Sequence, residues 1–273
     1  MKTPTIISFM LANDHPEYLS TGPLTVPRRA GLSFIFLLVT MVMTSIASIA
    51  DEPSSDDGDA ATVVRHLVFF DFKDDSSDMD IQSVVKAFDA LPSKIDVIKH
   101  YASGPVINPN KMSAGYDHAF MVTFADDAGR AVYLPHPAHQ AFVEVLKPHL
   151  GKVFVLDYDG VAAGADDIAS APGIKHAVFF KFKDDADPAA IKRIEQTFLD
   201  LKTAIGSVRH LDGGVNNSPE SHDQGFTHGF VVSFDSTDDL KAYGPHPAHQ
   251  KLVELLGPVM SEVRVIDFKV AAE

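Results

Sequence analysis

The stretch from Val64 to Phe72 is rich in Val and Phe and alternates with a period of two, which predicts a β-strand. From Asp80 to Leu91 the apolar residues recur every three to four positions, which predicts an amphipathic helix. The same reasoning predicts strands over 95–104, 116–124 and 152–158, and helices over 128–133 and 137–146. The resulting order, β-α-β-β-α-β, is that of a ferredoxin-like split βαβ unit.

The first predicted strand is apolar on both faces. Val68 and Phe70 point to one side of the strand, and Leu67 and Phe69 point to the other. A sheet that helices cover on one side only should show polar residues on its free face. The second apolar face therefore needs its own cover, and the simplest cover is another sheet packed face to face.

The second half of the chain repeats the first at a constant offset of 110 residues. His66–Phe70 returns as His176–Phe180, and Pro135–Gln140 returns unchanged as Pro245–Gln250. Halves that repeat one pattern share one fold. We therefore expect an α+β protein of tandem ferredoxin-like domains, whose two sheets form a dimeric-type α/β barrel within one chain.

The segment before the repeat has the features of an export signal. Arg28 and Arg29 precede an apolar run, and Ser48 and Ala50 are the small residues expected before a cleavage site. We expect export to the periplasm or the extracellular space after cleavage, although residues 30–50 are also about long enough to anchor the chain in a membrane. The predicted segments are the signal peptide or anchor (1–50), an acidic disordered linker (51–63), copy one (64–159), a linker (160–173) and copy two (174–273).

Composition narrows the range of partners. The formal net charge is −14 and no cluster of Lys and Arg stands out, so the sequence predicts no nucleic-acid partner. The chain has no cysteine, which excludes disulfides, Cys-ligated zinc and iron–sulfur clusters. We expect no cofactor and no metal site. The expected partners are the chain's own two halves, a further copy of the chain, a small apolar ligand, and a membrane only if the N-terminal segment stays uncleaved.

Four short motifs occur in both copies. Each copy opens with a His-hydrophobic strand that ends in Phe-Lys, and continues with Gly-Tyr/Phe-x-His, Tyr-x-x-His-Pro-x-His and Val-x-Asp-Tyr/Phe. In these motifs the chain resembles the stress-responsive A/B-barrel (Dabb) family over residues 64–159 and 174–269. The resemblance implies a ferredoxin-like domain that pairs through its sheet, a loose link to stress responses, and no assigned chemistry for most members.

The resemblance also implies candidate site residues. Plant polyketide cyclases, one branch of this family, perform an aldol condensation with the Tyr and the last His of Tyr-x-x-His-Pro-x-His. Carried over by motif, the catalytic candidates are Tyr133 and His139 in copy one, and Tyr243 and His249 in copy two. The other motif histidines are candidate ligand-binding residues: His66, His118, His136, His176, His228 and His246.

The Tyr-x-x-His-Pro-x-His motif also has a structural interpretation. A neutral His is a suitable base near pH 7, and a nearby Tyr hydroxyl can hold an enolate oxygen. Yet Pro137 suits the first turn of a helix, His136 can cap that turn, and His139 can bond the loop before it. His136 and His139 have a spacing that can meet one metal ion, but the proline between them and the lack of a third ligand argue against it.

Three hypotheses remain for function. The favoured one is an exported structural or small-ligand-binding module of the stress-response type, without catalysis. The second is a small lyase, cyclase or isomerase that uses His and Tyr in acid–base chemistry, and the third is a haem- or metal-handling barrel. If a single copy carries a site, the loop at 213–219 favours copy two, because it is closer to the family's usual loop than 105–109 is.

Overall fold

The computed structural model describes residues 62–108, 111–163 and 167–271. Copy one contains β1 (Thr62–Phe72), α2 (Asp78–Asp89), β2 (Ile98–Pro105), the 3-10 turn η1 (Lys111–Ser113), β3 (His118–Phe124), α3 (Asp127–Tyr133), α4 (Pro137–Leu146) and β4 (Leu150–Val161). Copy two contains β5 (Gly173–Phe182), α5 (Pro188–Leu199), α6 (Leu201–Ala204), β6 (His210–Val215), β7 (His228–Phe234), α7 (Thr237–Tyr243), α8 (Pro247–Leu256) and β8 (Met260–Val270). The predicted β-α-β-β-α-β order is confirmed in both copies.

The predicted export signal and most of the acidic linker lie outside the described residues. In the part of the chain that the structure does describe, no helix is both long and apolar enough to cross a membrane.

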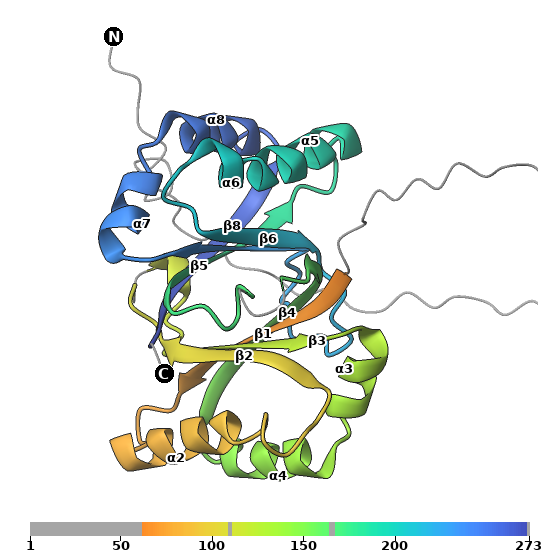
Figure 1. Ribbon diagram of the computed structural model, residues 1–273, viewed down its shortest axis with the longest axis vertical. Coiled ribbons are helices and arrows are strands. Elements are labelled where there is room, and N and C mark those ends of the chain that lie inside the picture. Colours follow the sequence, from red (N-terminus) through yellow and green to blue (C-terminus); the bar gives the residue numbers. More distant parts are fainter. Residues whose placement is uncertain (1–61, 109–110, 164–166, 272–273) are drawn as a thin grey trace, which may run out of the picture. The chain divides into compact units, whose positions relative to one another are not determined.

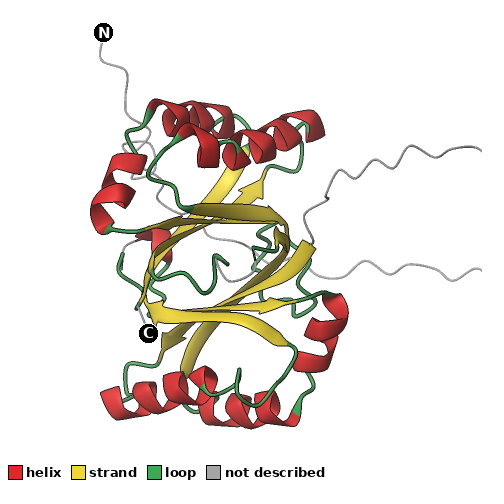
Figure 2. Ribbon diagram, in the orientation of Figure 1, coloured by secondary structure: helices red, strands yellow, loops and turns green. Residues whose placement is uncertain are grey.

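Each copy forms one antiparallel four-stranded sheet, with strand orders β2-β3-β1-β4 and β6-β7-β5-β8. The pairing of β1 with β4 sets His66 opposite Asp157, and the pairing of β5 with β8 sets His176 opposite Asp267. Figure 2 shows the strands of both sheets in the inner layers and the helices outside them. The strand register alone thus places one His–Asp pair side by side in each sheet.

Local capping signals fix where the helices begin. Ser77 and Asp80 form a capping box, which starts α2 at Asp78, two residues before the position that the apolar spacing predicted. His136 caps α4, and His246 caps α8. The bounds of α4, Pro137–Leu146, agree with the prediction. These caps fix the start of the two helices that carry the candidate residues His139 and His249.

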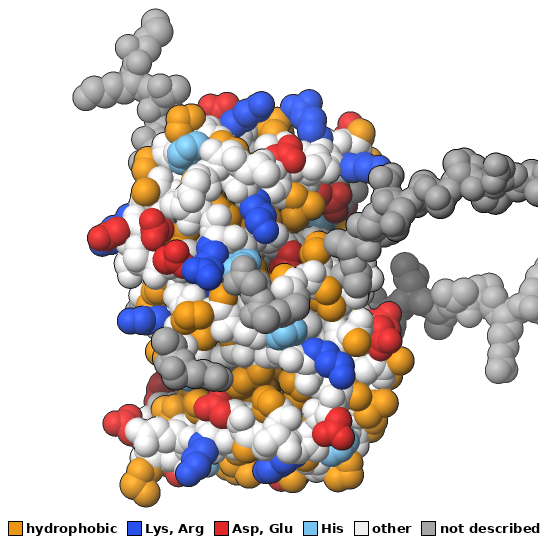
Figure 3. Space-filling model, viewed as in Figure 1, with side chains coloured by type: hydrophobic (Ala, Val, Ile, Leu, Met, Phe, Trp, Pro, Cys, Tyr) orange, Lys and Arg blue, Asp and Glu red, His pale blue; other side chains and the backbone are white. Residues whose placement is uncertain are grey.

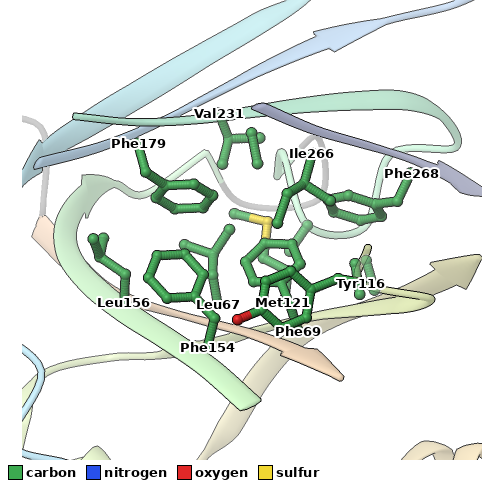
Figure 4. Packing of buried hydrophobic residues seen from close by; sticks show 14 of the residues in the cluster. Leu67, Phe69, Tyr116, Met121, Phe154, Leu156, Phe179, Val231, Ile266 and Phe268 are labelled. Atoms are coloured by element: carbon green, nitrogen blue, oxygen red, sulfur yellow. The ribbon is translucent and has the colours of Figure 1, made fainter. Parts of the chain in front are cut away.

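The two sheets pack face to face, as the two-sided apolar strands predicted. Figure 1 shows α2 and α4 on one outer side and α5 and α8 on the opposite side, with both sheets between them. Side chains of both copies share one buried cluster in which Phe69 meets Phe179 edge to face at 5.5 Å between ring centroids (Figure 4). The outer face of each sheet forms a separate core with its own helices.

A segment of each copy also pairs with the edge strand of the other copy's sheet. After β2, the amide of Ile107 donates to the carbonyl of Asp267 at 2.8 Å. After β6, the amide of Asn217 donates to the carbonyl of Asp157 at 2.9 Å, and the amide of Val155 donates to the carbonyl of His222 at 3.2 Å. These crossings cover the free edges of β4 and β8, which would otherwise present unpaired backbone groups.

A buried charge cluster joins the copies and the segment between them. Arg65 on β1 bonds Asp212 on β6 at 3.0 Å and Asp167 at 2.7 Å. Asp167, Ile168 and Ala169 are buried, so the second half of the expected linker packs as part of the fold. Charged side chains of both signs are interspersed on the face shown in Figure 3, as on an ordinary solvated surface.

Candidate functional site

Copy one contains a cavity of about 140 Å³ between its sheet and α4. Its walls are mostly apolar, and α4 contributes Phe142, Val143 and Leu146 to them. An apolar cavity of about 150 Å³ is known to hold benzene, so this one has room for roughly six to eight non-hydrogen atoms. The polar or ionisable residues in its wall are His66, Tyr133, His139, Glu220 and His222.

His139 is held as a neutral base. Its Nδ1 lies 2.9 Å from the carbonyl oxygen of Leu134. A carbonyl only accepts hydrogen bonds, so Nδ1 carries the proton and Nε2 keeps its lone pair. Burial lowers the pKa of His139 more than the bond to Leu134 raises it, so the ring is neutral near pH 7. A neutral imidazole with a free Nε2 is the form that can accept a proton from a ligand.

Tyr133 places an unpaired hydroxyl beside His139. The ring centroids of the two residues are 4.4 Å apart, and Tyr133 is fully buried. Its hydroxyl has no hydrogen-bond partner among the described residues. Burial raises the pKa of Tyr133 above its usual value, so the hydroxyl stays protonated and can donate to a ligand oxygen. A buried polar group without a partner is costly, which makes this hydroxyl a candidate for binding a ligand.

His66 is the third polar group, and its ring is oriented by Asp157, which Arg130 holds in turn. Its Nδ1 lies 2.8 Å from Asp157, and Arg130 binds the other oxygen of Asp157 at 2.7 Å. Burial by itself lowers the pKa of His66, but the carboxylates of Asp157 and Glu220 outweigh burial and raise it. His66 therefore holds a proton more readily than His139. The pKa of one cavity histidine is raised and that of the other is lowered.

Glu220 and His222 reach this cavity from the loop between β6 and β7 of copy two. His222 stands where the first copy has Met112, and the sequence did not place it in a site. The loop at 213–219 favoured copy two if a single copy carries a site, and that choice of copy stays a prediction. The chain after β6 runs along β4 of copy one, a crossing that no local pattern reports. Glu220 itself was missed.

Copy two repeats the central geometry with fewer charges. His176 lies 2.6 Å from Asp267, and the rings of Tyr243 and His249 are 4.5 Å apart. His249 bonds the carbonyl of Gly244 at 2.9 Å, as His139 bonds that of Leu134. The position equivalent to Arg130, however, is Leu240.

The remaining candidate histidines stand apart from the cavity of copy one. His136 accepts a hydrogen bond from the amide of Ala138 at 3.1 Å, and His246 makes the equivalent bond at 3.2 Å. Burial lowers the pKa of His118 to about 4, while His228 bonds Glu195 at 3.0 Å. None of these four residues lines that cavity.

The described residues contain no preformed cluster of metal-ligating side chains. Over residues 62–108, 111–163 and 167–271, no group of three or more His, Asp or Glu side chains is arranged to hold an ion. His136 and His139, whose spacing suggested a shared ligand set, instead bond backbone groups through their Nδ1 atoms.

Three comparisons relate the chain to known proteins. The sequence model of the family described as "Stress responsive A/B Barrel Domain" matches residues 64–159 and 174–270. The stress-response A/B barrel domain-containing protein HS1 of Arabidopsis thaliana is 33% identical over 95 residues, 35% of this chain and 87% of that protein. Olivetolic acid cyclase of Cannabis sativa is 24% identical over 95 residues, 35% of this chain and 94% of that protein. A solved structure from Fusobacterium nucleatum subsp. nucleatum matches 78% of this chain and 94% of its own with a TM-score of 0.56 at 10% identity, which shows a common fold.

Proposed function

The chain belongs to the stress responsive A/B barrel domain family, and from that premise we propose that copy one binds a small carbonyl compound and moves a proton at the carbon beside the carbonyl. The observation that carries the proposal is the pairing of the unpartnered Tyr133 hydroxyl with His139 on one cavity wall. The family includes a relative that is named a cyclase, which supports chemistry of this type.

The two side chains divide the reaction between them. Nε2 of His139 takes the proton from carbon, the electron pair of the C–H bond forms a C=C bond to the carbonyl carbon, and the C=O π pair moves to the oxygen. The Tyr133 hydroxyl donates a hydrogen bond to that oxygen as its charge develops. The protonated His139 then returns a proton from Nε2 to the carbon, which reforms the ketone and regenerates the base; in D2O the Nε2 proton exchanges with solvent first, so deuterium is delivered. The apolar wall excludes water, which strengthens both interactions.

A binding module without catalysis is the second candidate function. The cavity of about 140 Å³ is smaller than the 300–1,000 Å³ of typical ligand pockets, which favours a small ligand or the buried end of a larger one. Binding without proton transfer would distinguish this candidate from the enzyme.

Filling the cavity tests the proposal. Cyclohexanone has seven non-hydrogen atoms, and NMR reports both its binding and its uptake of deuterium beside the carbonyl in D2O. We expect binding and exchange above the buffer rate for the natural protein, and a loss of about tenfold or more of both in Val143→Phe, because the new ring occupies the cavity.

The matched control for that experiment is Val253→Phe, the equivalent position on α8 of copy two. It should leave binding and exchange unchanged. If the natural protein neither binds cyclohexanone nor accelerates exchange, or if Val143→Phe leaves both unchanged, the copy-one site is refuted.

We further propose that the chain is exported and that the mature protein begins at Asp51. The support is the apolar run after Arg28 and Arg29 and the small residues Ser48 and Ala50. N-terminal sequencing of the protein recovered outside the cytoplasm should start at Asp51. Recovery of the uncleaved chain in the membrane fraction would instead support the anchor.

A further inference from the structure

One carboxylate oxygen of Glu220, which lines the copy-one cavity, has no hydrogen-bond donor among the described residues. This oxygen, Oε2, is buried and lies 3.6 Å from Nδ1 of His66. That distance is too long for a hydrogen bond, and the proton of His66 Nδ1 is already directed at Asp157, 2.8 Å away. Arg130 binds the other oxygen of Asp157, and Glu220 faces His66 only as an ion pair at 3.6 Å, so the hydrogen-bonding capacity of its Oε2 is left for another donor.

The loop that carries Glu220 is fixed on both sides of it. Before Glu220, the amide of Asn217 bonds the backbone of β4, and the Asn217 side chain accepts from Arg130 at 2.8 Å. After it, the carbonyl of His222 accepts from Val155, and Gln224 donates to the Tyr116 hydroxyl at 2.9 Å. Glu220 is therefore positioned by the fold of both copies.

The negative charge of Glu220 reaches the reacting groups. Burial lowers the pKa of His66, but Asp157 and, to a smaller extent, Glu220 raise it. Burial raises the pKa of Tyr133, and Glu220 adds to that rise. At the free Oε2 itself, a carboxylate disfavours an anionic group of the ligand and favours a hydrogen-bond donor.

We propose that Glu220 is a specificity-determining residue, which accepts a hydrogen bond from a hydroxyl or ammonium group on the carbonyl ligand and rejects ligands that carry a carboxylate. This inference rests on the proposed function and names the substrate class for that site. It also assigns the selectivity to copy one, because the position equivalent to Glu220 is Asn110, which lies outside the described residues, and Leu240 replaces Arg130.

A series of 4-substituted cyclohexanones tests the inference, and because the carboxylate is two atoms larger than the others, its affinity is compared between protein variants. Dissociation constants are measured by NMR for 4-hydroxycyclohexanone, 4-aminocyclohexanone, 4-methylcyclohexanone and 4-oxocyclohexanecarboxylate. In the natural protein, we expect the hydroxyl or the ammonium compound to bind roughly 10- to 100-fold tighter than the methyl compound, as a hydrogen bond to a buried charge allows. The carboxylate should bind most weakly.

Two substitutions show whether the ligand's donor is an ammonium group or a hydroxyl group. Glu220→Gln keeps an acceptor but removes the charge, so it should abolish a preference for the ammonium compound and improve binding of the carboxylate. Glu220→Leu removes the acceptor as well and should also abolish a preference for the hydroxyl compound. Glu254→Gln, an exposed charge change on α8, is the control and should leave every ratio unchanged.

The ratio of two dissociation constants is the readout, because a purely structural defect would weaken all four ketones together. Equal ratios in the natural protein and both Glu220 variants, or tightest binding of the carboxylate, would overturn the role of Glu220 while the proposed function stands. Failure of every ketone to bind would instead refute the proposed function.

Discussion

Replacement of His139 by Gln should slow deuterium exchange into cyclohexanone by about 10²- to 10⁴-fold, the usual contribution of a positioned general base. Gln keeps a polar side chain of similar length but has no basic nitrogen. Tyr133→Phe should cost about 10²- to 10³-fold, because the enolate oxygen loses its donor. NMR of the exchange reaction measures both rates.

The equivalent variants of copy two, His249→Gln and Tyr243→Phe, are the matched controls. They change the same local contacts, since His249 bonds the carbonyl of Gly244 as His139 bonds that of Leu134. Their exchange rates should stay close to that of the natural protein. A loss of about half in each set would place activity in both copies, because the rates of two sites add, and no loss in either set would remove His and Tyr from the mechanism.

The pH profile gives a second readout for His139. Its pKa lies below the ordinary value of 6.5, chiefly because burial disfavours the charged ring. The neutral form is the base, so exchange should hold as the pH falls to 6.5 and decline only below it. A decline centred above pH 6.5 would point to His66, whose pKa is raised, and would contradict the assignment.

Replacement of Arg65 by Met should lower the free energy of unfolding by about 3–5 kcal/mol, the cost of leaving buried charge without its partner. The side chain is fully buried and joins three parts of the chain, because it bonds Asp167 and Asp212 and donates to the carbonyl of Val161 at 2.8 Å. Met would leave two carboxylates in the interior. Urea denaturation at pH 7 gives the difference.

Lys175, the residue equivalent to Arg65 in copy two, supplies the control. It is also fully buried, but its ammonium donates to the carbonyl of Ala171 at 2.7 Å, and burial lowers its pKa to about 8. Lys175→Met leaves no paired carboxylate behind, so its effect should stay within about 1 kcal/mol. If the two substitutions cost the same, the ionic cluster is not what holds the copies together.

Joint replacement of Arg65, Asp167 and Asp212 by Met, Asn and Asn should recover part of the stability lost in Arg65→Met.

The sequence determined each copy's architecture because the relevant signals are local. A period of two in β1, the helical spacing of α2 and the Pro137 start of α4 each specify an element within a dozen residues. The two-sided apolar pattern of Leu67 and Phe69 against Val68 and Phe70 also required a second cover, and the repeat identified which sheet supplies it. The motif resemblance brought Tyr133 and His139 together as candidates, and the structure places them on one cavity wall.

Only the tertiary structure decided which residues meet across the copies. Arg65 and Asp212 are 147 positions apart, and no spacing along the chain pairs them. Glu220 enters the cavity of copy one because the chain after β6 crosses to the edge of β4, a crossing that no local pattern reports. The physical reason is that periodicity and capping act over a few residues, whereas these contacts depend on how two packed sheets and their edges fit in space.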